Sequence, residues 1–97
     1  MNINYMKKIN KILTVTSILK NEIILDIRSE EEREKFPLKI KKQKIKYMSF
    51  YNLHKNFKNL DQKKTWLLYC NRGVMSKIQA IYLYELGFKN IKIYKIN

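Results

Sequence analysis

Two unbroken runs of mainly apolar residues stand out in the chain, EIILDI at residues 22 to 27 and TWLLYC at 65 to 70. Runs of this kind are typical of strands buried on both faces, whereas half-exposed strands alternate apolar and polar positions. The β-branched ILTVT at 12 to 16, the weakly alternating KIKYMSF at 44 to 50 and IKIYK at 91 to 95 predict three further strands. The pattern therefore predicts about five short strands.

Helical patterns lie between these strands. Ser29 and Glu32 predict a capping box at the start of a short acidic helix that ends before the single proline. Apolar residues recur at helical spacing in residues 50 to 60 and again in residues 76 to 88. Strands that alternate with short helices form βαβ units, so the sequence predicts an α/β domain with a mainly parallel central sheet flanked by helices.

Length and composition favour one compact domain. The chain has 97 residues, of which 45% are hydrophobic, and a net charge of +13. Eighteen of its 21 basic residues are lysines, and they are dispersed, with only residues 39 to 46 dense enough to count as a basic patch. The charge alone therefore does not indicate a specific nucleic-acid site. We expect residues 1 to 21 to be a basic N-terminal segment with a possible first strand, and residues 22 to 97 to be the domain.

The single cysteine bears on the cellular compartment. One cysteine cannot form an internal disulfide, which favours a reducing compartment, and we expect a cytoplasmic protein. No apolar run in residues 1 to 21 is long enough for a membrane span, and none favours a secretory signal. One cysteine and one histidine, sixteen residues apart, do not form a zinc site, so no metal is expected.

Cys70 ends a predicted strand, and the carboxyl ends of parallel strands are where ligands gather. Loop amides and a helix N-terminus would form an anion cradle around it and favour the thiolate. Arg72 would add a full positive charge, and Gly73 can adopt the positive φ of a tight turn. The alternative, a thiol that packs only as a small apolar group, stays open. The predicted cradle comprises Asn71, Arg72, Gly73, Val74, Met75 and Ser76.

Other interpretations fit the residues less well. Cysteine-dependent phosphatases also place a cradle after a strand, but their loop ends at an arginine, and Ser76 stands in that position here. His54 lies in a predicted helix and is a weak candidate for a catalytic base. Trp66 and Tyr69 belong to the predicted strand at 65 to 70, where core packing explains them.

The segment CNRGVMS, following TWLLY, resembles the active-site loop of the rhodanese superfamily, in which six residues cradle a persulfide-bearing cysteine. Two longer blocks, ILDIRSEEEREKFPLKI and FYNLHKNFKNLDQKKTWLLYCNRGVMSKIQAIYLYELGFKNIKIYK, resemble in the same order the C-terminal rhodanese domain of bacterial tRNA 4-thiouridine synthetases. That family also supplies sulfur for the thiamine thiazole. The resemblance covers residues 22 to 95.

The resemblance implies a rhodanese-type sulfurtransferase that uses no cofactor. Cys70 would be the catalytic persulfide cysteine, and Asp26 and Arg28 would brace the active-site region. A cysteine desulfurase would donate the sulfur, and the 4-thiouridine or thiazole machinery would accept it, with tRNA associated only indirectly and no membrane partner. The sequence contains neither the RNA-binding and adenylation domains of that family nor its second essential cysteine, so we do not expect it to thiolate tRNA alone. A non-catalytic module that docks RNA or protein remains the alternative.

Overall fold

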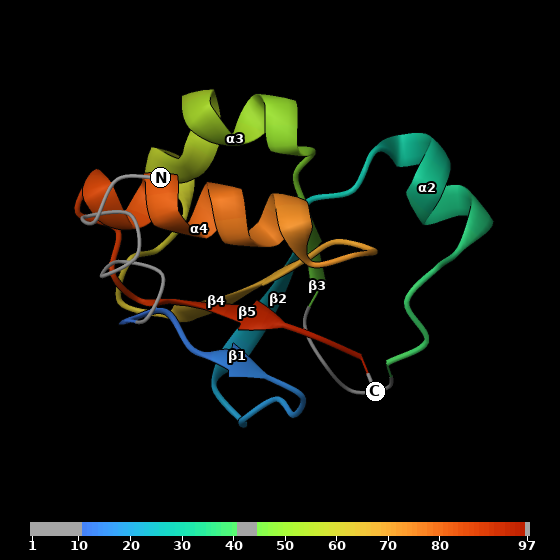
Figure 1. The fold of residues 1–97 in the computed structure, drawn as a ribbon, viewed down its shortest axis with the longest axis horizontal. Coiled ribbons are helices and arrows are strands. Elements are labelled where there is room, and N and C mark those ends of the chain that lie inside the picture. Colours follow the sequence, from blue (N-terminus) through green and yellow to red (C-terminus); the bar gives the residue numbers. More distant parts are fainter. Residues whose placement is uncertain (1–10, 41–44, 97) are drawn as a thin grey trace.

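A computed structural model describes residues 11–40 and 45–96, and it forms an α/β fold around one five-stranded sheet (Figure 1). All strand pairs are parallel, in the order β1-β5-β4-β2-β3. This confirms the predicted fold class. The observed strands are slightly shorter than the predicted ones: β1 (Thr14–Val15), β2 (Glu22–Asp26), β3 (Ile45–Tyr47), β4 (Thr65–Tyr69) and β5 (Ile91–Tyr94).

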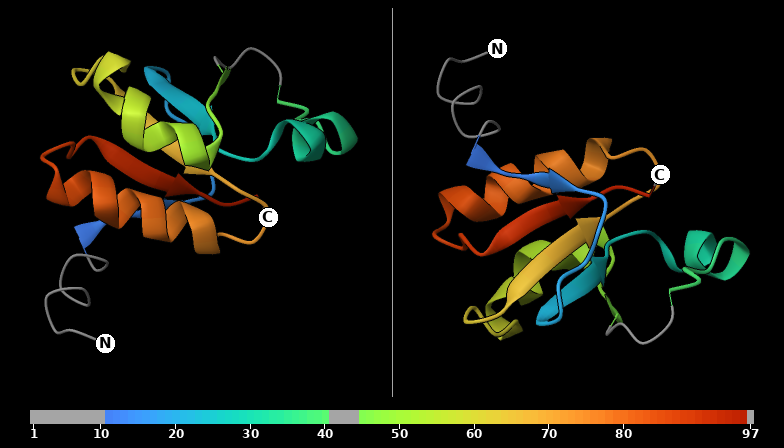
Figure 2. Two further views of the ribbon diagram at one scale, coloured as in Figure 1. Left: turned by 90° about the horizontal axis from the view of Figure 1, so that it is seen from above. Right: turned by 90° about the horizontal axis from the view of Figure 1, so that it is seen from below.

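Two helices, α3 (Phe50–Asn56) and α4 (Val74–Glu85), cover the same face of the sheet (Figure 2). The predicted helix at 50 to 60 is divided, because a short 3-10 helix, η1 (Phe57–Asn59), follows α3. The helix α2 (Glu30–Lys35) lies to the side of α3 and α4 and buries none of its residues. Its capping box is confirmed, since Ser29 and Glu32 exchange both expected bonds.

The buried residues form a cluster on each face of the sheet. The larger cluster lies between the sheet and the two helices and includes Leu25, Leu68 and Ile93. The smaller cluster lies on the other face, where Ile24 and Leu67 pack against partly buried residues of the connecting segments. Neighbouring residues of β2 and β4 point to opposite faces, so both faces of each strand are buried. This explains the two continuous apolar runs in the sequence.

Two sequence predictions fall partly outside the described residues. The basic patch at 39 to 46 includes residues 41–44, which the structure does not describe, and residues 1–10 of the N-terminal segment are likewise not described. β1, within that segment, pairs with β5 at the edge of the sheet. Within residues 11–40 and 45–96, the structure contains no helix with the length and apolar character that crossing a membrane requires.

Candidate active site around Cys70

Cys70 follows β4, the central strand of the sheet, directly. Its side chain is half-buried and its thiol is free. Because all five strands are parallel, the carboxyl end of β2 lies beside that of β4, with Asp26 in register with Tyr69. The sheet therefore places the segment after β2, with Arg28 and Ser29, next to the loop after Cys70.

The thiol of Cys70 contacts the beginning of α4. The backbone N–H of Ser76 donates a hydrogen bond to Sγ over 3.2 Å. Gly73 is the N-cap residue of α4 and offers no side chain, so Sγ accepts the N–H at the third helical position as a capping oxygen would. Gly73 has φ of 76°, which confirms the expected positive value.

The length of the loop differs from the sequence prediction. The structure begins α4 at Val74, whereas the helical pattern predicted a start near Ser76. Val74, Met75 and Ser76, three of the six predicted cradle residues, thus form the first turn of the helix. The apolar pattern could not show this start, because Val74 is 62% exposed and the helix is capped by a sulfur atom from outside the helical segment.

Ser76 has a second polar group beside the thiol site. Its side chain is fully buried, and its hydroxyl oxygen has no hydrogen-bond partner among the described residues. A buried hydroxyl without a partner costs free energy, on the order of 1 to 3 kcal/mol. Such groups are uncommon in folded proteins, and this one belongs to the residue whose amide already contacts Sγ.

Asp26 and Arg28 form a buried ion pair behind the loop. The guanidinium donates to both carboxylate oxygens, from Nε over 3.0 Å and from Nη2 over 2.8 Å. These bonds to Asp26 raise the pKa of Arg28 above its ordinary value. The same guanidinium donates through Nη1 to the carbonyl oxygen of Phe36, over 2.7 Å, and lies 5.0 Å from the ring centre of Tyr69. Burial raises the pKa of the Tyr69 hydroxyl.

Asn71 connects the loop to this ion pair and to α2. Its amide nitrogen donates to Oε2 of Glu32 over 2.7 Å, and its amide oxygen accepts from Nη1 of Arg28 over 3.4 Å. The sequence predicts Glu32 only as a capping residue. A glutamate in a capping box uses one carboxylate oxygen for the cap, so the other oxygen is free to accept a bond, but nothing local in the sequence identifies Asn71 as its partner.

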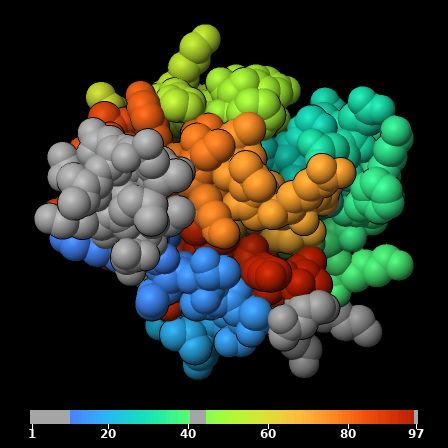
Figure 3. Space-filling model, in the orientation of Figure 1, coloured from blue at the N-terminus to red at the C-terminus, as the bar shows by residue number. Residues whose placement is uncertain are grey.

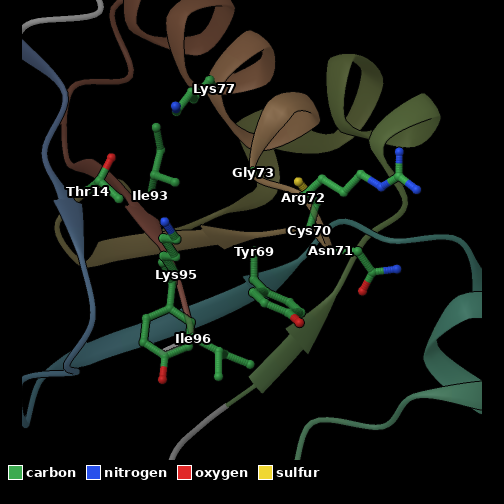
Figure 4. A pocket seen from close by; sticks show the side chains of 11 residues that line it. Thr14, Tyr69, Cys70, Asn71, Arg72, Gly73, Lys77, Ile93, Lys95 and Ile96 are labelled. Carbon is green, nitrogen blue, oxygen red and sulfur yellow. The ribbon is translucent and has the colours of Figure 1, made fainter.

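Two cavities flank the Cys70 loop. The β5-side cavity, of about 210 Å³, is lined by Cys70 together with Thr14, Tyr69, Asn71, Arg72, Gly73, Lys77, Ile93, Tyr94, Lys95 and Ile96 (Figure 4). The α3-side cavity, of about 460 Å³, is lined by Cys70 with Arg28, Glu32, Phe50, Asn71, Arg72, Val74 and Met75. The exposed Arg72 lines both, and in Figure 4 its side chain extends away from Lys77 and Lys95. The thiol can therefore be approached from two sides.

His54 and Trp66 take no part in this site, whereas Tyr69 also lines the β5-side cavity. His54 is exposed on α3, where its ring packs against Tyr82 with 4.1 Å between the ring centres, and it lines neither cavity. Trp66 and Tyr69 are buried, as predicted for core residues. No group of three or more His, Cys, Asp or Glu side chains that could hold a metal ion occurs in the part of the chain that the structure describes.

Cys70 therefore lies at the carboxyl end of a central parallel strand and caps the next helix. The family model for the rhodanese-like domain matches residues 14–96 of the chain. The chain belongs to the rhodanese-like domain family. Among its curated relatives are proteins named tRNA sulfurtransferase. The one from Shewanella halifaxensis is 53% identical over 88 residues, and the one from Erwinia tasmaniensis is 49% identical over 89 residues.

These alignments cover 91% and 92% of this chain but only 18% of each relative, so the chain spans about a fifth of their length. Among solved structures, a NAD-dependent persulfide reductase from A. fulgidus superposes with a TM-score of 0.72 at 26% identity, over 99% of this chain and 17% of that one. A rhodanese-related protein from Thermoplasma volcanium superposes with a TM-score of 0.66 at 23% identity, over 80% of this chain and 73% of that one, and shows the shared fold.

Proposed function

We propose that the chain is a sulfurtransferase module that carries sulfane sulfur as a persulfide on Cys70. Membership of the rhodanese-like family and the relatives named for tRNA sulfur transfer support this class of chemistry. The observation that carries the proposal is the hydrogen bond from the Ser76 amide to Sγ, which directs the thiol at the N-terminus of a twelve-residue helix. Such a terminus favours an anionic sulfur.

The transfer step is a thiol exchange. The Cys70 thiolate attacks the terminal sulfur of a donor persulfide, the sulfur–sulfur bond of the donor breaks, and the donor cysteine leaves as a thiolate. The product on Cys70 is a persulfide whose terminal sulfur carries negative charge. The helix N-terminus, the amides of the cradle residues 71 to 76 and the positive charge of Arg72 stabilise that anion, while Asp26 and Arg28 hold the loop from behind.

The partners follow from the relatives and from the resemblance. A cysteine desulfurase is the proposed donor, because it generates a cysteine persulfide. The proposed acceptors are the machinery for 4-thiouridine in tRNA or for the thiamine thiazole, in the cytoplasm, and the chain needs no cofactor for the exchange itself. Residues 1 to 21 would form a basic N-terminal segment that contributes the first strand, β1, to the sheet of the carrier domain.

Mass spectrometry tests the proposal directly. After incubation with a cysteine desulfurase and cysteine, the protein is expected to gain the mass of one sulfur atom, and a thiol reductant should remove it. If the protein gains no sulfur while it binds RNA or a partner protein, the proposal fails and a non-catalytic docking module becomes the better interpretation.

Ser76→Ala separates sulfur binding from folding. The variant keeps the backbone N–H that contacts Sγ and removes a buried hydroxyl that has no partner in the described part of the chain, so we expect its free energy of unfolding to stay equal or to rise by about 1 kcal/mol. If the hydroxyl bonds to the terminal sulfur, the persulfide of the variant should decay several times faster. Urea denaturation and timed mass spectra measure the two effects, and an unchanged decay rate would exclude this role of the hydroxyl.

Gly73→Ala tests the turn that leads from Cys70 into α4. Apart from the two chain neighbours of Gly73, no atom of the described residues lies within 4 Å of an added Cβ, so the cost comes from the positive φ alone, about 1 to 2 kcal/mol. Gly87→Ala is the matched control, because Gly87 also has positive φ, 94°, and open space, but ends α4 at the far end from Cys70. Both variants should lose similar stability in urea, and only Gly73→Ala should load sulfur more slowly. Equal loading by both would mean that the turn does not set the position of the thiol.

A further inference from the structure

Helix α4 has apolar side chains on two of its faces. One face is buried in the larger cluster between the helices and the sheet. The exposed face of the helix and its C-cap has an apolar residue at every fourth position, each 40% to 62% exposed: Val74, Ile78, Tyr82 and Leu86. Side chains four residues apart are neighbours on a helix surface, so these residues form a continuous row, which we call the α4 stripe. Contiguous exposed apolar residues of this kind mark interaction sites, whereas single ones do not.

The α4 stripe begins at the Cys70 site. Its first residue, Val74, lines the α3-side cavity together with Cys70. Phe50, at the start of α3, lines the same cavity, and the exposed Tyr51 packs edge-on against it with 5.5 Å between the ring centres. Figure 3 shows α4 at the surface of the molecule, with α3 above it and β1 and β5 below it. A molecule that covers the stripe therefore also covers the α3-side approach to the thiol.

Tyr82, in the middle of the stripe, is held in place by α3. Its ring centre lies 4.1 Å from that of His54, while 40% of its surface stays exposed. A side chain that is already fixed loses little conformational entropy when a partner binds. Tyrosine is also frequent among the few residues that dominate the binding energy of protein interfaces. His54, which lies outside the Cys70 site, thus positions a residue that is suited to bind a protein.

The elements that carry and border the stripe are basic. Lys55, Lys58 and Lys77 lie in α3, η1 and α4, and Glu85 is the one acidic residue of these three elements. Arg72 adds a positive charge at the cavity end of the stripe. A second copy of the chain would place this basic surface against itself, because an isologous interface pairs identical patches. The charges therefore favour a partner that has acidic residues around an apolar patch.

We propose that the α4 stripe is the docking surface for the protein that donates sulfur to Cys70, and that this donor contacts the stripe with an apolar patch bordered by acidic residues. The inference rests on the proposed function, because it assigns the surface that the donor of that function uses. The donor carries its sulfur on a cysteine side chain, so it is a protein and can cover an apolar row. It would bring its cysteine to Cys70 through the α3-side cavity and leave the β5-side cavity open for the acceptor.

Loading rates with two sulfur donors test this surface. A cysteine desulfurase has to dock, whereas inorganic polysulfide gives one sulfur atom to the Cys70 thiolate without docking and leaves as a polysulfide one atom shorter. Ile78→Gln/Tyr82→Gln removes two apolar residues of the stripe and keeps a helix-forming residue at both positions. Leu13→Gln/Leu19→Gln is the matched control, because both leucines are exposed, lie outside α4 and line neither cavity beside Cys70.

The stripe variant should raise the KM of the chain in the desulfurase reaction about tenfold, because two anchoring side chains are lost. Its kcat and its rate with polysulfide should stay near the wild-type values, and the leucine control should match the wild type in both reactions. An unchanged KM in the stripe variant, or an equal rise in both variants, would overturn the inference. A similar loss with polysulfide would also overturn it, because the substitutions would then act on the thiol site itself. Circular dichroism melts establish that each variant is folded.

Lys58→Glu tests the charge of the donor. Lys58 follows His54 by four residues, on the side of α3 and η1 that borders the stripe, so the change would place a carboxylate against acidic residues of the donor. We expect a severalfold rise in KM. Lys20→Glu changes the net charge equally, at an exposed position between β1 and β2, and should change KM little. A lower KM in Lys58→Glu would indicate a basic partner and would contradict the assignment.

Analytical ultracentrifugation and the polysulfide reaction separate the remaining outcomes. A wild-type dimer that dissociates in Ile78→Gln/Tyr82→Gln would assign the stripe to a second copy of the chain and overturn its assignment to the donor. If the wild type gains one sulfur from both donors and the stripe variant keeps the wild-type KM, only the docking surface is wrong. If the wild type gains no sulfur from either donor, the persulfide proposal itself is wrong.

Discussion

Cys70→Ser abolishes sulfur loading altogether, if Cys70 carries the persulfide. A serine oxygen cannot form a persulfide, so incubation with a cysteine desulfurase and cysteine should leave the mass of the variant unchanged. The substitution replaces a half-buried thiol by a hydroxyl of similar shape, and Ser76 can still donate its N–H to the new oxygen. We therefore expect the melting curve to change little.

The control for this experiment is the wild type loaded and then treated with a thiol reductant. Its mass should return to that of the unloaded protein, which distinguishes a persulfide from an oxidised cysteine of similar mass. A sulfur gain that persists in Cys70→Ser would place the sulfur elsewhere on the chain or in a noncovalent adduct, and would contradict the assignment of Cys70.

Arg28→Ala should give the largest loss of stability, about 3 to 5 kcal/mol. The substitution leaves the carboxylate of Asp26 buried without its cation, since both side chains are almost wholly inaccessible, at 1% and 0% exposure. It also removes the bonds from the guanidinium to Phe36 and to Asn71. The loop after Cys70 then loses the hydrogen bond between Arg28 and Asn71, so loading should slow in the fraction that stays folded. Urea denaturation measures the stability.

Two further variants show whether the loss comes from the unpaired charge. Lys35→Ala removes an exposed ion pair with Glu31 on α2 and should cost at most about 1 kcal/mol. The double variant Asp26→Leu/Arg28→Met replaces the buried pair by apolar side chains and should recover most of the stability lost in Arg28→Ala. A double variant as unstable as Arg28→Ala would instead assign the loss to the bonds that Arg28 makes to Phe36 and Asn71.

The architecture could be predicted from the sequence because the pattern of apolar residues along each strand depends on which of its faces are buried. Both faces of β2 and β4 are covered, by α3 and α4 on one side and by connecting segments on the other, and this produces the continuous apolar runs. Ser29 and Glu32 predicted the start of α2 because a capping box uses only local contacts. The position of Cys70 at the carboxyl end of a strand followed from the same pattern.

The surroundings of Cys70 could be predicted only in part. The start of α4 depends on a bond between Sγ and an amide six residues later, which apolar periodicity does not report. The contact of Asn71 with Glu32 joins residues 39 positions apart, and the lysines of the β5-side cavity come from α4 and from the segment after β5. Contacts of this kind depend on the order of the strands, which a single sequence does not specify.

The two cavities on either side of the Cys70 loop bear on the order of events in a turnover. If both substrates used one opening, the donor would have to leave before the acceptor entered, and the kinetics would follow a double-displacement scheme with parallel double-reciprocal plots. With separate approaches to the same thiol, from α3 on one side and β5 on the other, donor and acceptor can be bound together. The terminal sulfur would then pass between two bound partners, and the persulfide would spend less time exposed to competing thiols in solution.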